Sequence, residues 1–94
     1  MGLKISRSDD LKTGRIVLLV EGSLTADCAD LLESEILKLL SGPMRKVCIE
    51  LKELTFLDES GANALARLKE CPDVYLKGSR LFTRQMINGA RKQQ

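Results

Sequence analysis

The sequence of 94 residues contains no histidine and no tryptophan, and only 3% of its residues are aromatic. Without histidine the chain lacks the side chain that most often serves as a general base near neutral pH and as a zinc ligand. One tyrosine and two phenylalanines are too few to form a row of platforms on which nucleic-acid bases stack. The composition therefore argues against a histidine-dependent enzyme, an ordinary zinc site and a nucleic-acid partner.

Cysteine is scarce as well. Cys28, Cys48 and Cys71 are odd in number, and none of them lies in a C-x-x-C arrangement. Neither a disulfide framework nor a cysteine metal site is expected from this spacing. We interpret the three as reduced, buried, small apolar side chains of a cytoplasmic protein.

Long apolar runs are absent too. No stretch reaches the roughly 18 apolar residues that span a bilayer, and the N-terminus has no signal-like apolar core. A length of 94 residues with 44% hydrophobic content suits one compact domain. The sequence thus predicts a single cytoplasmic domain without a membrane span.

Acidic residues are missing from the end of the chain. None follows Asp73, whereas Lys77, Arg80, Arg84, Arg91 and Lys92 give the last segment a charge of +5 within a total of +2. Such a run is typical of a solvated outer helix face and a basic tail. A docking surface for an acidic partner is the functional alternative.

The apolar pattern predicts strands, helices and their order. Leu3 to Ser8 alternates as a half-buried strand, and the unbroken run IVLLV, Ile16 to Val20, is typical of a central strand covered on both faces. A helix follows from about Ala26 to Leu40, capped by Thr25, and Leu31 falls opposite its core-facing stripe. The spacing further predicts a short strand over Val74 to Lys77 and a last helix after Ser79.

The stretch from Lys46 to Leu68 changes its period at its middle. Val47, Ile49 and Leu51 alternate as in a strand, and Leu54, Phe56 and Leu57 continue the apolar character to the turn. The residues after Gly61 have helical spacing. A helix therefore starts in the segment Leu57-Asp58-Glu59-Ser60-Gly61, with Asp58 as its cap. Strands joined through helices run parallel, so we expect an α/β fold with a mixed four-stranded sheet in the order strand, strand, helix, strand, helix, strand, helix.

The start of this helix is the best candidate for a functional site in the sequence. The first backbone N–H groups of a helix lack internal partners and its dipole favours negative charge there, so a phosphate on Ser60 would be tolerated. The alternative is that Asp58 and Ser60 are ordinary capping residues.

The strand, the segment F-L-D-E-S-G and the alanine- and leucine-rich helix resemble the STAS family of anti-sigma factor antagonists and sulfate-transporter C-terminal regions. The resemblance extends to Glu21-Gly22-Ser23-Leu24-Thr25 and to the late strand, and so covers nearly the whole chain. It implies a STAS-like domain over residues 1–90, followed by a flexible tail over residues 91–94. In the family the usual turn is D-S-S-G, and its second serine, here Ser60, is phosphorylated by a partner kinase.

The resemblance implies a regulatory protein-binding module of bacterial signalling that controls transcription. It would bind a kinase-type anti-sigma factor and be switched by phosphorylation of Ser60. The partner-binding residues would be Asp58, Glu59, Ser60, Gly61, Asn63 and Leu31. Glu59 stands where the first serine is usual, and Ala62 and Asn63 replace the usual Leu and Gly.

These departures leave a second function open. STAS-like domains also act as constitutive adaptor subunits of a transporter or lipid-transport complex, beside its ATPase or permease and without phosphorylation. Under either hypothesis we expect a protein partner and no enzymatic activity, and no catalytic residue, metal or cofactor. The pattern does not determine the oligomeric state.

Overall fold

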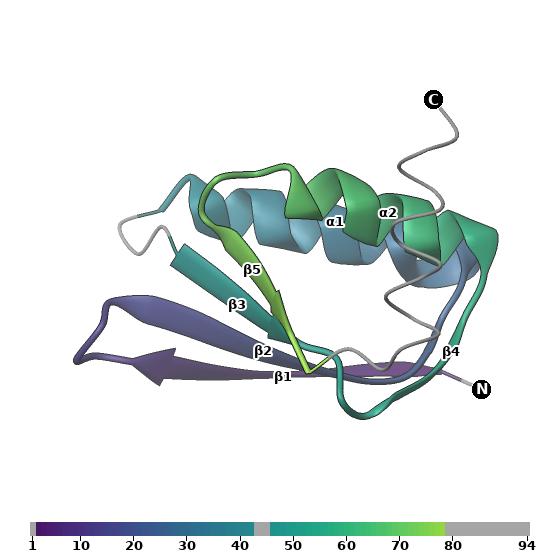
Figure 1. The fold of residues 1–94 in the computed structure, drawn as a ribbon, viewed down its shortest axis with the longest axis horizontal. Coiled ribbons are helices and arrows are strands. Elements are labelled where there is room, and N and C mark those ends of the chain that lie inside the picture. The colour runs from purple at the N-terminus through teal and green to yellow at the C-terminus, as the bar shows by residue number, and fades with distance from the viewer. Residues whose placement is uncertain (1, 43–45, 79–94) are drawn as a thin grey trace.

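A mixed sheet of five strands carries two helices on one of its faces in the computed structural model, which describes residues 2–42 and 46–78 (Figure 1). The elements are β1 (Leu3–Asp10), β2 (Arg15–Leu24), α1 (Ala26–Leu40), β3 (Lys46–Glu50), β4 (Leu54–Leu57), α2 (Glu59–Lys69) and β5 (Val74–Lys77). The predicted last helix and the tail over residues 91–94 lie outside the described residues.

The sheet has the order β1-β2-β3-β5, with β2 and β3 in its interior. β1 is antiparallel to β2, and the other two pairs in this order, β2 with β3 and β3 with β5, are parallel. The predicted α/β class and mixed sheet are confirmed. The parallel pairs follow from helical connections, and β1 joins β2 through the short turn over residues 11–14.

One strand was not predicted. β4 pairs in parallel with the C-terminal end of β2, where Ser23 lies opposite Phe56 and Leu24 opposite Leu57. The sequence pattern of this stretch indicated only apolar character leading to the turn. Its four residues do not alternate in burial, so they carry no period of two, and the pairing depends on a strand far away in the sequence.

The central strand β2 is buried mainly on its helix side. Ile16, Leu18 and Val20 are no more than 3% exposed, whereas Val17 and Leu19 point to the opposite face and are only half-buried. The predicted central place of this strand is confirmed. Among the described residues the predicted cover of its second face is only partial, because both helices lie on the same face (Figure 1).

The helix α1 has the predicted bounds and orientation. Its buried residues are Ala29, Leu32 and Ile36, with Leu39 and Leu40 packed partly against the same core. Leu31 points away from this stripe and is 61% exposed, as predicted. The two helices lie side by side, and α2 contributes Ala62, Ala64, Leu65 and Leu68 to the shared core.

Candidate functional site

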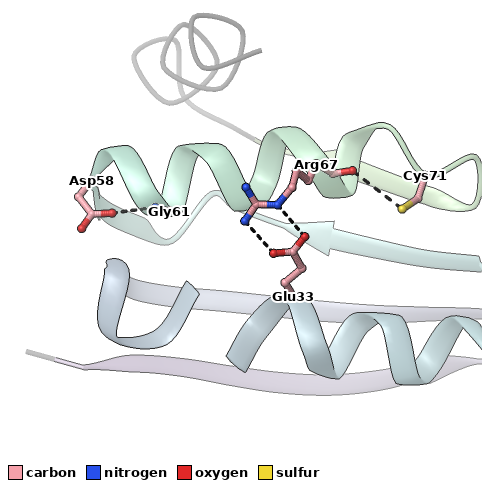
Figure 2. A network of polar contacts seen from close by, with 5 residues as sticks. All are labelled: Glu33, Asp58, Gly61, Arg67 and Cys71. Carbon is pink, nitrogen blue, oxygen red and sulfur yellow. Dashed lines mark hydrogen bonds and ion pairs between the residues drawn. The ribbon is translucent and has the colours of Figure 1, made fainter. Parts of the chain in front are cut away.

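The two helices start at the same end of the sheet, and one carboxylate joins their first turns. Asp58 Oδ1 accepts a hydrogen bond from the backbone N–H of Gly61 at 2.7 Å. Asp58 Oδ2 accepts a second from the backbone N–H of Ala26, the first residue of α1, at 2.9 Å. The predicted cap of α2 is thus confirmed (Figure 2). The same side chain also satisfies an N–H group of the neighbouring helix.

Thr25 does not act as predicted. It occupies the cap position of α1 with extended backbone, but its side chain makes no capping hydrogen bond. Its backbone carbonyl accepts from Ala29, which closes the first turn. The side-chain part of the cap comes from Asp58, which lies 32 residues after the donor Ala26 along the chain.

Gly61 lets α2 approach the end of β2 closely. A Cβ atom at this position would overlap the carbonyl oxygen of Leu24 and would lie 2.9 Å from Cδ1 of Leu57. The backbone N–H of Asp58 also donates to the Leu24 carbonyl, at 3.2 Å. The start of α2 is therefore fixed against β2 by packing and by hydrogen bonds.

Ser60 lies on the outside of this fixed turn. It is the second residue of α2 and is exposed, as is Glu59, while Asn63 one turn later is half-buried. The acidic residues of the first turns are Asp27 in α1 and Glu59 in α2. Together with Asp58 they give this end of the molecule a negative charge, which the two helix dipoles stabilise.

The structure brings most of the predicted site residues together. Asp58, Glu59, Ser60, Gly61 and Asn63 belong to the first turns of α2, whereas Leu31 lies on the solvent side of the neighbouring helix. Along the axis of α1, Leu31 is roughly 7 Å from the helix start.

Sequence reasoning missed Phe56 as a surface residue. It is 53% exposed on β4, two residues before Asp58, although it was assigned to the apolar approach to the turn. The burial of Leu54 and Leu57 without Thr55 and Phe56 breaks a period of two. The one signal in the sequence was the position of a large aromatic residue directly before a polar turn in a chain with so few aromatics.

An ion pair holds α1 and α2 together away from the turn. Arg67 donates to both carboxylate oxygens of Glu33, with Nε at 2.9 Å and Nη2 at 2.8 Å (Figure 2). The hydrogen bonds to Glu33 raise the pKa of Arg67 above its ordinary value. Such a forked pair fixes the relative orientation of the two helices.

The described residues contain no group of three or more acidic or cysteine side chains that could hold a metal ion. All three cysteines are free, but only Cys48 is buried, whereas Cys28 and Cys71 are half-buried. Within residues 2–42 and 46–78, neither helix has the length and apolar character that a bilayer span requires.

A family model described as STAS domain matches residues 7–74, and this region contains both helices and the turn at Asp58. The chain belongs to the STAS family. The match includes all the predicted site residues, so the resemblance inferred from F-L-D-E-S-G is confirmed. A search of curated proteins finds no significant match.

Solved structures show the same fold in this STAS domain and its neighbours. An anti-sigma factor antagonist from Mycobacterium paratuberculosis superimposes with a TM-score of 0.70 and 21% identity, over 98% of this chain and 82% of that chain. The anti-sigma factor antagonist SpoIIAA in its unphosphorylated form gives a TM-score of 0.67 and 16% identity, over 90% of this chain and 82% of that one. At these identities the likeness concerns the fold.

Proposed function

We propose that this STAS domain is a cytoplasmic anti-sigma factor antagonist. It binds a kinase-type anti-sigma factor through the start of α2 and the exposed side of α1, and phosphorylation of Ser60 releases the partner. The observation that carries the proposal is the exposed Ser60 in a turn whose backbone is fixed on the inside by Asp58 and Gly61.

A fixed turn suits both states of such a switch. Unmodified Ser60 presents a small, neutral hydroxyl group on a surface that does not need to be ordered on binding, so little conformational entropy is lost. A phosphate adds about −1.5 to −2 charges at neutral pH. Because Asp27, Asp58 and Glu59 are close by in the same first turns, that charge accumulates on one contact surface.

The phosphate would change the partner's affinity more than the fold. The helix dipole favours an anion at the second residue of α2, whereas repulsion from Glu59 and Asp58 opposes it. These two effects act on the folded domain in opposite directions. In the complex, desolvation and repulsion of the added charge both weaken binding.

Exchanging Ser60 in this chain tests the proposal. The partner is an anti-sigma factor encoded in the same genome, and its binding to wild type, Ser60→Ala and Ser60→Asp is compared by calorimetry. Ser60→Ala should bind about as tightly as wild type, and Ser60→Asp at least about tenfold more weakly, which corresponds to about 1.4 kcal/mol. Equal binding of the two variants contradicts the switch.

A constitutive adaptor in a transporter complex is the second candidate. Glu59 favours it, because this exposed carboxylate gives the turn a permanent negative charge in the place where the family usually has a serine. The adaptor hypothesis expects a stable complex with an ATPase or permease in the native cells. It also expects Ser60 to be unmodified in every growth state, as measured by phosphopeptide mapping.

A further inference from the structure

The strand β1 forms an edge of the sheet. Its one partner among the described residues is β2, and it is eight residues long, twice the length of the other edge strand β5. An edge of this length presents unpaired backbone groups to which a further strand can add. Short edges, proline and bulges commonly prevent this, but β1 contains no proline and its register with β2 is regular.

The backbone phase of β1 shows which residues would pair. The carbonyl oxygen of Gly2 accepts a hydrogen bond from the N–H of Ser23, its counterpart on β2. Because these directions alternate along an antiparallel strand, the even-numbered residues point their backbone groups at β2. The odd-numbered residues Ile5, Arg7 and Asp9 therefore point theirs at the open edge.

The side chains of these odd-numbered residues and of Leu11 have an order that is complementary to its own reverse. They read apolar, positive, negative, apolar from Ile5 through Arg7 and Asp9 to Leu11. Arg7 and Asp9 are partly exposed and already bonded to each other, with 2.8 Å between Nε and Oδ1. Ile5 is 38% exposed, and Leu11, the first residue after β1, is 86% exposed.

We propose that the open edge of β1 is a dimerisation surface for a second copy of this chain. Two β1 strands pair antiparallel about a two-fold axis through Ser8, so that Arg7 lies opposite Asp9 of the second copy. Ile5 then lies level with Leu11 of the second copy, at the start of the turn after β1. The two Arg7–Asp9 pairs exchange about four backbone hydrogen bonds, and opposite charges face each other at both positions. The five strands of each copy then continue as one sheet.

The order of charges along β1 favours a second copy of this strand as the partner, and it favours the antiparallel direction. Lys4 and Arg7 precede Ser8 on β1, and Asp9 and Asp10 follow it. A parallel second copy in register would place Arg7 beside Arg7 and Asp9 beside Asp9, whereas the antiparallel copy places Arg7 opposite Asp9 at both positions. A two-fold arrangement uses the same patch twice, as closed dimers of identical chains do.

Sedimentation equilibrium of the full chain provides the test. We expect a reversible change from 10.4 kDa to twice that mass, with a dissociation constant in the range of roughly micromolar to submillimolar, as for small interfaces. Arg7→Asp and Asp9→Arg should each weaken the dimer at least about tenfold, because each change converts both attractive pairs into repulsive ones. Lys38→Glu, a matched charge reversal on the exposed side of α1, should leave it unchanged.

Mixing the two single variants tests the register itself. In an equimolar mixture each acidic edge meets a basic edge at both positions, so Arg7→Asp with Asp9→Arg should form a heterodimer at least as tight as the wild-type dimer. The double variant R7D/D9R again places opposite charges against each other at both positions and should dimerise alone. Circular dichroism spectra confirm that each variant is folded.

Four outcomes overturn the proposal. A wild-type chain that stays monomeric at about 1 mM has no such surface. A dimer that Arg7→Asp leaves intact uses another surface, and single variants that fail to pair on mixing exclude this register. Binding of the β1 edge to a different protein, without self-association at that concentration, also counts against it.

Discussion

The carboxylate of Asp58 accepts a hydrogen bond from the backbone N–H of Ala26 over 2.9 Å, so the cap of α2 is at the same time a cap of α1. Its other oxygen binds the N–H of Gly61. The two helices consequently share one negative group at their positive ends, and that group lies two residues before Ser60. Stability and the proposed switch therefore depend on the same turn.

Asp58→Ala should destabilise the domain by about 1.5 to 3 kcal/mol, because it removes an N-cap worth about 1 kcal/mol and a second charge-assisted hydrogen bond. Urea denaturation measures the loss. Asp58→Asn keeps one acceptor and should cost less. Thr25→Ala, at the cap position of α1, should change the stability by less than about 0.5 kcal/mol. A larger loss for Thr25→Ala than for Asp58→Ala would contradict the shared cap.

The sequence predicted those parts of the fold that depend on local pattern. α1 from Ala26 to Leu40 has a long helical stripe, and β5 from Val74 to Lys77 follows Asp73 and ends with a lysine, so their bounds agree with the structure. β4 was missed because its partner is β2 and its own four residues carry no period.

The residues of the turn at the start of α2 were predictable from the sequence, whereas the contacts around that turn were not. Asp58, Ser60 and Gly61 stand in a sequence signature, and a cap is a local feature. The bond from Ala26 to Asp58 exists because two helix starts meet in space, which no local pattern contains. The exposure of Phe56 likewise follows from the pairing of β4 with β2.

Gly61→Ala should destabilise the domain, although the same change within an exposed helix stabilises it by about 1 kcal/mol. The added Cβ atom meets the Leu24 carbonyl and Leu57, and α2 can only avoid them by moving away from β2. Overpacking of this kind costs about 1 to 3 kcal/mol. Thermal unfolding gives the sign, and Ser60→Ala, the exposed neighbour, is the matched control. An increased melting temperature for Gly61→Ala would show that the turn has room.

The Glu33–Arg67 pair should show a coupling energy of about 0.5 to 1 kcal/mol in a double-mutant cycle with alanine. The pair is forked, but Arg67 is half exposed, so solvent limits its contribution. Because the pKa of Arg67 is raised, its positive charge is fully present at every pH below the ordinary arginine pKa and is lost only as the pH rises through the higher folded value. Arg67 therefore has the same charge at about pH 6 and about pH 9, and its contribution to the coupling energy should be the same at both. The more exposed pair of Glu35 and Lys38 is the control, with a coupling near zero.

Arg7 lowers the pKa of Asp9 below 3.8, chiefly through the hydrogen bond between their side chains. A lowered pKa in the folded state means that the stabilising contribution is present above the ordinary pKa and is lost as the pH falls through the lower folded value. Arg7→Ala should therefore move the pKa of Asp9 upward, as followed by the carboxyl carbon shift in an NMR titration. Lys12→Ala removes a positive charge from the same hairpin and should leave the pKa of Asp9 where it is. An unchanged pKa in Arg7→Ala would exclude the ion pair in solution.

Phe56→Ser should weaken binding of the anti-sigma partner at least about tenfold while changing the stability by less than about 1 kcal/mol. An aromatic side chain that is 53% exposed contributes little to the core, but it lies two residues before Asp58, beside the proposed contact surface. Aromatic residues next to a charged turn commonly carry much of the binding energy of an interface. Tyr75→Ser is the matched control, because Tyr75 is similarly exposed, at 43%, on the edge strand β5. Calorimetry with the partner measures binding and urea denaturation measures stability. Equal affinities for Phe56→Ser and wild type would restrict the contact surface to α2 and the exposed side of α1.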